Sequence, residues 1–202
     1  MAINDAGLMQ ATRGTVFTAP AKTALPDDLS AFILNADNIK VGTGENAPVW
    51  TNTGHSANGS KPTFNKDGGD TSSLDTWLKE GVKTTVAATK WSVAITSVQA
   101  DKKSLQETTG GWAGANNKGI VVPSTPTTQH KALVVLCYDS ADKLSFAVYS
   151  PEADQVFDNI NMSGDEFIEF SYNATFKSTD VLPKGPNGEN GMFLLLSPED
   201  FK

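Results

Sequence analysis

Histidine and cysteine, the residues best suited to nucleophilic or metal chemistry, are scarce in this chain, which has two histidines and one cysteine. His55 lies in Gly54–Gly59, where a serine between glycines is similar to the nucleophile turn of hydrolases, but the second glycine comes one residue too late. His130 begins an expected strand, where a surface position is the simpler interpretation. A Ser-His-acid triad and a standard zinc site both need more partners than these residues supply.

The single cysteine, Cys137, lies in the apolar run Leu133–Tyr138. This setting favours a buried, inert thiol over a nucleophile. One cysteine also excludes a disulfide within the chain, which fits a reducing compartment.

Two glycine-containing stretches match ligand-binding motifs only in part. Gly42–Ala47 has the spacing of a dinucleotide fingerprint, yet Pro48 and a strand-like Val-Trp-Thr follow instead of a helix, which indicates a glycine-rich connection. Asn65–Asp70 has calcium-like acid spacing, but Asp70 occupies the position where a calcium loop needs glycine, so a tight turn is expected. Ion binding near Asp67 and Asp70 stays open on the sequence alone. We expect no cofactor, no metal and no catalytic activity.

The composition favours one acidic β domain over residues 1–202. The hydrophobic fraction is 39%, and small polar residues are abundant, which suits strands with long connections better than a helical bundle. The net charge of −7 and the scattered basic residues argue against tight nucleic-acid binding, which needs clustered Lys and Arg. No apolar run is long enough for a membrane span, and Met1–Gly14 contains no apolar secretory core, so we expect no membrane partner.

Alternation and turn residues predict a mainly β fold with one short α-helix. The segments expected to form strands are Gly14–Thr18, Val49–Thr53, Lys61–Asn65, Lys90–Gln99, Gly119–Val122, His130–Tyr138, Leu144–Tyr149, Asp165–Lys177 and Met192–Leu196. The Ser-x-x-Glu spacing of Ser104–Glu107 predicts a helix start, and Gly110 and Gly111 predict its end. Asn35–Gly81 is otherwise a long region with little regular pattern, which is typical of functional or interface-forming loops.

The clearest pattern lies in Asp165–Lys177. Here Ile168, Phe170, Tyr172, Ala174 and Phe176 alternate with Glu169, Ser171, Asn173 and Thr175. A period of two predicts a long strand with one buried face and one hydrated face, available for pairing at a sheet edge.

Three polar segments lack periodicity: Met1–Arg13, Gly42–Gly59 and Ser178–Gly191. Such segments bury too little apolar surface to fix themselves, so we expect them to be mobile in an isolated subunit and ordered against neighbouring subunits. We interpret the first as an N-terminal arm, the second as a long loop, and residues 178–202 as a C-terminal arm.

Five short motifs occur in a defined order: Gly14–Pro20 (G-x-x-F-x-A-P), Ala21–Pro26, Thr53–Ala57, Phe64–Asp70 (F-x-x-D-G-G-D) and Leu74–Leu78 (L-x-T-W). In this order and spacing they resemble segments of the major tail tube proteins of long-tailed phages of actinobacteria. The chain departs from that family at Lys22, where the family usually has glycine in a G-T-A-L-P segment.

The resemblance implies a tail-tube fold, a β-sandwich or split barrel with one short flanking helix and long loops. It further implies a structural virion protein whose hexameric rings stack into a tube, assembled in the host cytoplasm and located in the tail. The implied partners are other copies of the chain, a tape measure protein in the lumen, and tail terminator and distal tail proteins at the ends. Double-stranded DNA would pass through without specific binding during ejection into the host.

The resemblance and the hydrated strand face together suggest site residues. The candidates for the lumen are Asp165, Glu169, Ser171, Asn173 and Thr175, and the candidates for contacts between subunits are the Met1–Arg13 arm and the Gly42–Gly59 loop. Because carboxylates repel phosphates, an acidic lumen would let DNA slide.

Two alternatives stay open. A tube protein of a contractile tail or related injection machine would share the ring but bind a sheath outside. A secreted β-sandwich binding module would share the composition, but it should carry a signal peptide, and none is seen at the start of this sequence.

Overall fold

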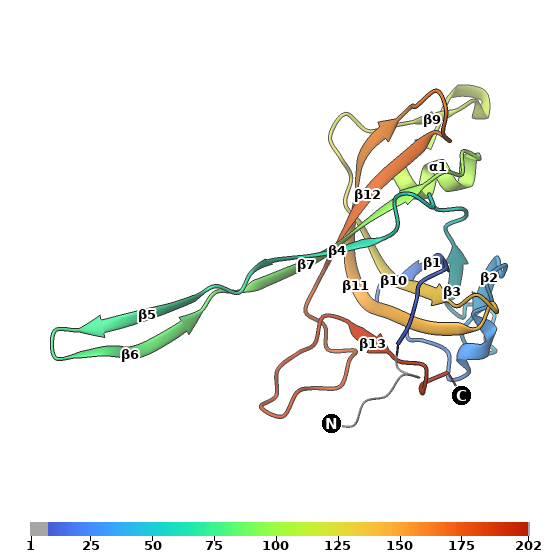
Figure 1. Cartoon of the computed structure of the whole chain (residues 1–202). Helices are drawn as coiled ribbons and strands as arrows, with labels where there is room; N and C mark the ends of the chain where they lie inside the picture. The colour runs from blue at the N-terminus through green and yellow to red at the C-terminus, as the bar shows by residue number, and fades with distance from the viewer. Residues whose placement is uncertain (1–7, 202) are drawn as a thin grey trace.

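The computed structural model describes residues 8–201, and a nine-stranded antiparallel sheet dominates this part of the chain (Figure 1). The strands in chain order are β1 (Arg13–Pro20), β2 (Asn38–Lys40), β3 (Val49–Asn52), β4 (Thr63–Gly68), β5 (Thr71–Thr76), β6 (Lys79–Val86), β7 (Thr89–Ser97), β8 (Trp112–Ala113), β9 (Ile120–Val121), β10 (Gln129–Tyr138), β11 (Leu144–Asn161), β12 (Glu169–Phe176) and β13 (Leu194–Leu196). The helix α1 spans Lys102–Thr109, and short 3-10 turns lie at Leu29–Ala31 and Ala115–Asn117. The mainly β fold expected from the sequence is confirmed.

The order of strands in the large sheet is β2-β3-β1-β10-β11-β12-β7-β4, and β13 adds to β11. Strand β11 has 18 residues and serves both halves of the sheet. It pairs with β10 from Leu144 to Gln155 and with β12 from Ala153 to Asn161. The sheet does not close on itself, because β2 and β4 stand at its two ends in the described part of the chain.

The middle strands β1 and β10 are buried on both faces. On one face, Val16 and Val135 join Val93, Ile95 and Tyr172 in a core that links β1 and β10 with β7 and β12. Residues from both halves of the sheet therefore share one core, as in a sandwich or split barrel.

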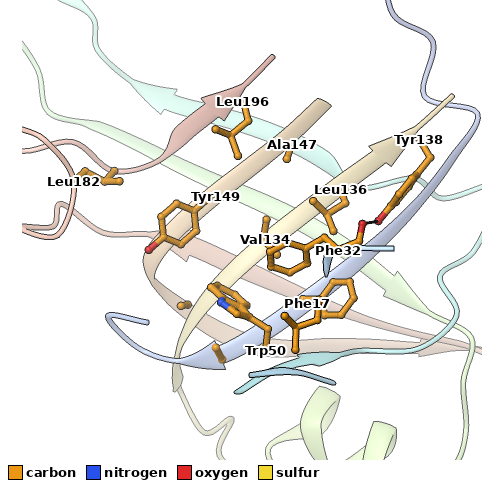
Figure 2. Close-up of a cluster of buried hydrophobic side chains, with 13 residues drawn as sticks. Phe17, Phe32, Trp50, Val134, Leu136, Tyr138, Ala147, Tyr149, Leu182 and Leu196 are labelled. Atoms are coloured by element: carbon orange, nitrogen blue, oxygen red, sulfur yellow. Dashed lines mark hydrogen bonds between the residues drawn. The ribbon is translucent and has the colours of Figure 1, made fainter. Parts of the chain in front are cut away.

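The opposite face of β1 and β10 carries a second, aromatic core (Figure 2). Phe17, Phe32, Trp50 and Tyr149 pack edge to face in sequence, with ring centroids 5.2, 6.1 and 6.0 Å apart. Each such contact contributes about 1 kcal/mol beyond the burial of its area.

Hydrogen bonds from the buried aromatic residues hold the loop after β1 on this core. Trp50 Nε1 donates to the carbonyl of Ala24 (3.1 Å), and the Tyr149 hydroxyl donates to the carbonyl of Thr23 (2.8 Å). The Tyr138 hydroxyl donates to the carbonyl of Phe32 (2.7 Å), as Figure 2 shows. Burial raises the pKa of Tyr149 to about 12, so this donor keeps its proton at neutral pH.

Helix α1 begins about one turn before Ser104, where the sequence predicted its start. Asp101 is the N-cap, and its carboxylate accepts from the amides of Lys103 (3.0 Å) and Ser104 (3.1 Å). Hydrogen bonds from Gln99 and Ser104 lower the pKa of Asp101 to about 2. The expected end at Gly110 is confirmed, since this glycine adopts a left-handed φ of 66°.

Two strand predictions need correction. Strand β11 does not end at Tyr149 but continues through Pro151 to Asn161, because a register shift opposite Lys131 and Leu133 accommodates the proline. Strand β12 starts at Glu169 instead of Asp165, and it lies between β11 and β7. The expectation of an edge strand there was therefore wrong.

Strands β4 to β7 form a long two-stranded ribbon that the sequence did not predict. Strand β4 pairs with β7 at the sheet, and β5 pairs with β6 farther out, so the ribbon projects from the body (Figure 1). The tight turn expected at Asn65–Asp70 is wrong, because the chain runs on from β4 into β5. Gly68 and Gly69 form a kink there with φ values of 75° and 81°, which favour glycine.

Two of the three segments expected to be mobile in the isolated subunit pack against the fold. Gly42–Gly59 is not one loop, since it contains β3 and the fully buried Trp50. The C-terminal segment buries Thr179, Leu182 and Leu196, and the Thr179 amide donates to the carbonyl of Gly191 (2.9 Å). Residues 1–7 of the expected N-terminal arm lie outside the described residues.

Lys22, the departure from the family pattern, has a backbone φ of 66°, in the left-handed region that glycine adopts without strain. Its Nζ lies 3.1 Å from Asp180 and 3.6 Å from Glu152. The lysine thus ties the loop after β1 to the C-terminal segment at a position with backbone strain.

Comparing Lys22→Gly with Lys22→Ala isolates this strain. Both variants lose the contacts with Asp180 and Glu152, but only glycine relaxes at a positive φ. We expect Lys22→Gly to be more stable than Lys22→Ala by about 1 kcal/mol in urea unfolding of the isolated subunit. Equal stabilities would show that the backbone here is not strained.

Candidate assembly surfaces

One face of the strands β12, β7 and β4 carries short polar side chains and is called the polar face below. It consists of Glu169, Ser171, Asn173 and Thr175 of β12, Ser92, Ala94 and Thr96 of β7, and Thr63 and Asn65 of β4, and it continues towards the ribbon with Lys90 of β7 and Asp67 of β4. The buried hydrophobic residues of β12 and β7 all lie on the opposite face: Phe170, Tyr172, Ala174, Phe176, Val93 and Ile95. The polar face therefore has no hydrophobic layer packed against it from the described residues.

The structure brings four of the five predicted lumen residues onto this face, and leaves Asp165 in the exposed turn before β12. Glu169 accepts hydrogen bonds from Ser60 (3.4 Å) and Asn161 (3.1 Å). Ser171 and Thr96 share a hydrogen bond across the strands (3.1 Å). Paired neighbours of this kind hold the polar side chains in a fixed array.

Charged groups lie at the two ends of the polar face, and its centre is uncharged. Glu169 marks one end. At the other end Asp154 of β11, the register partner of Thr175, lies 2.6 Å from His130 and 3.3 Å from Lys177. His130 is thus an exposed partner of a carboxylate, in agreement with its expected surface position.

The outer ribbon, β5 and β6, is exposed along its whole length. Trp77 and Leu78 at its tip are fully exposed, and Leu74, Val82 and Val86 are more than half exposed. A two-stranded ribbon is marginally stable alone, and apolar side chains at its end gain free energy when a partner covers them. The ribbon is therefore a candidate contact element.

A second exposed apolar group lies in the turn between β11 and β12. Met162 and Phe167 are 73% and 78% exposed, and Ile160 and Ile168 are nearly half exposed. This turn borders the Glu169 end of the polar face. An apolar rim at the end of a sheet is typical of a surface that meets another chain.

A cleft of about 750 Å³ lies between α1, the start of β1, the loop after β3 and the end of β10. Its lining includes Leu34, His55, Ser56, Phe64 and Cys137. The Ser56 Oγ is buried without a hydrogen-bond partner among the described residues.

Cys137 is only partly buried, which corrects the expectation of an enclosed thiol. Burial still raises the pKa of the thiol, so Cys137 is a weak nucleophile. The prediction that His130–Tyr138 is a core strand is confirmed, because Leu133, Val134 and Leu136 are buried.

The described residues contain no group of three or more His, Cys, Asp or Glu side chains placed to hold a metal ion. Asp67 lies on the edge strand β4 opposite Lys90. Within residues 8–201, none of the helices is both long enough and apolar enough to cross a membrane. The distinctive features of the described residues are the polar face, the ribbon and the cleft.

An uncovered sheet face, two open sheet edges and a projecting apolar ribbon define the class of a structural subunit that completes itself in an assembly. The comparisons with known proteins agree. The sequence profile of the phage tail tube protein family matches residues 1–184. The chain belongs to this family, so it is a structural component of the virion tail and not an enzyme.

Two relatives support this assignment. The major tail protein Gp23 of Mycobacterium phage D29 is 30% identical over 149 residues, which cover 71% of this chain and 72% of the relative. Gp23 of Mycobacterium phage L5 matches with the same identity and coverage. The resemblance inferred from the short motifs is thereby confirmed.

The exposure of Trp77 makes a prediction for the isolated subunit. Trp77→Ala should change the free energy of unfolding by less than about 0.5 kcal/mol, because the side chain buries nothing there. Trp91→Ala should lower it by about 2 kcal/mol, because Trp91 packs edge to face on Phe193 at 5.3 Å. Urea unfolding followed by circular dichroism measures both, and a large loss for Trp77→Ala would mean that the ribbon folds back on its own body.

Proposed function

We propose that this chain forms hexameric rings that stack into the tail tube of a long, non-contractile phage tail, and that double-stranded DNA passes through this tube during ejection into the host. The polar face, which extends to the open edge strand β4, carries the proposal. Strands β2 and β4 each offer one unpaired side. Closing six such sheets into a ring removes these edges from solvent.

In this arrangement the polar face lines the channel. Its central hydroxyl and amide groups bind water, and its charged groups lie towards its ends. DNA phosphates would find no cations along the centre of this wall and would gain nothing there from counterion release. Glu169 then repels phosphates from one end of each subunit's share of the wall, and Asp165 does so from the adjoining turn.

Stacking of the rings follows from the projecting parts of the subunit. A contact between different surfaces of identical chains repeats without closing and gives a filament. The ribbon, the exposed turn after β11, the Met1–Arg13 segment and the exposed parts of Gly42–Gly59 are the contact elements in this proposal.

Membership of the tail tube family supports the remaining partners. A tape measure protein would occupy the channel before DNA enters. Tail terminator and distal tail proteins would cover the two open ends of the tube, where the contact surfaces of the last rings stay free.

The test replaces Glu169 in phage. Six copies of Glu169→Lys per ring would place cations along the wall, so DNA ejection should slow several-fold at low salt and recover as salt screens the contact. Glu169→Gln separates the loss of negative charge from the gain of positive charge. Glu199→Lys, at an exposed C-terminal position, serves as the matched control and should eject normally.

Ejection is followed by DNA release from purified phage on addition of the receptor. Normal ejection at low salt from phage whose tails contain Glu169→Lys would remove Glu169 from the channel. Slow ejection by Glu199→Lys as well would show that surface charge in general, not the polar face, sets the rate.

A further inference from the structure

The apolar tip of the ribbon is uncovered by the rest of residues 8–201. Trp77 and Leu78 are fully exposed, and within residues 8–201 the main contacts of β5 and β6 are with each other. The outer ribbon, Thr71 to Trp77, extends about 20 Å beyond the sheet at the rise of a β-strand. Its tip therefore lies far from the body of the same chain (Figure 1).

We propose that the ribbon tip of one copy docks into the cleft of a neighbouring copy. This inference rests on the proposed tube, because it names the contact that joins successive subunits. In Figure 1 the ribbon points to the left, whereas the cleft elements α1, β1 and β3 lie on the right of the molecule. A projection on one side and a cleft on the other match a repeating head-to-tail contact.

The cleft has the size and chemistry to receive the tip. Its volume of about 750 Å³ suits an aromatic side chain and its neighbour. Leu34, Phe64 and Cys137 supply apolar contacts. The indole N–H of Trp77 needs a partner when buried, and the cleft lining also includes polar side chains such as Asn35 and Asn58.

The charges of the two surfaces also fit. Two acids of the cleft are already engaged, since Asp101 caps α1 and Glu107 lies 2.6 Å from Lys131. Lys61 and Lys103 line the cleft, and neither forms an ion pair within the described residues.

The ribbon tip brings Asp75 and Glu80 together with Lys79, so its acids outnumber its bases. Asp37 is a remaining acid in the cleft and would face Lys79. Opposite charges at the rim of a contact fix its register more than its affinity.

The native Cys137 makes the contact directly testable. In Leu78→Cys, docking would bring the new thiol close to Cys137 of the next copy, and mild oxidation of assembled tubes should give disulfide-linked ladders on a non-reducing gel. The double variant Leu78→Cys with Cys137→Ser should give no ladder beyond dimers. Leu195→Cys, on the exposed β13, is the control for random oxidation and should give none.

Wild-type protein provides a second measurement if Leu78→Cys fails to assemble. Cys137 should react with a thiol reagent at least about ten-fold more slowly in tubes than in free subunits, because the tip fills the cleft. Tubes in which Cys137 reacts as in the free subunit would overturn the docking and leave the proposed function standing. Wild-type protein that forms no tubes at all would overturn the proposed function and the docking together.

Discussion

Strand β11 hydrogen-bonds to β10 along its first part and to β12 along its last part, and the arrangement of every other element depends on this shared strand. Around its middle, Ser150 donates to the carbonyls of Glu152 and Met192, both at 3.0 Å, and holds the irregular stretch at Pro151. One sheet thereby supplies both sides of the core that contains Val16, Val135 and Tyr172. The same path leaves the polar face uncovered and directs the ribbon of β4 to β7 away from the body.

The sequence predicted those strands in which buried and hydrated side chains alternate. The alternation at Phe170 and Tyr172 located β12 and its two faces correctly, because burial on one side imposes a period of two. The outer ribbon was missed because it buries neither face, so Thr71–Thr76 and Lys79–Val86 carry no such signal. The sequence predicted a strand end at Tyr149, and only the pairing partner shows that β11 continues past Pro151.

The candidate assembly surfaces also differ in whether the sequence could predict them. The alternation in β12 placed Glu169, Ser171, Asn173 and Thr175 on one hydrated face, since a strand's local geometry fixes where its side chains point. The cleft is lined by segments from Ala11 to Cys137 that meet only in the folded chain, and no local pattern marks it. The left-handed backbone of Lys22 was not predicted either, because a lysine carries no local signal for a positive φ.

In the proposed tube, neighbouring subunits complete the unfinished sheet of this acidic chain. The central claim is the orientation of the polar face, and helical reconstruction by electron cryomicroscopy of tubes grown from the purified chain tests it most directly. The account predicts six chains per ring with Ser171, Asn173 and Thr175 facing the bore. Tubes in which this face points outward, or a chain that stays monomeric at high concentration, would contradict it.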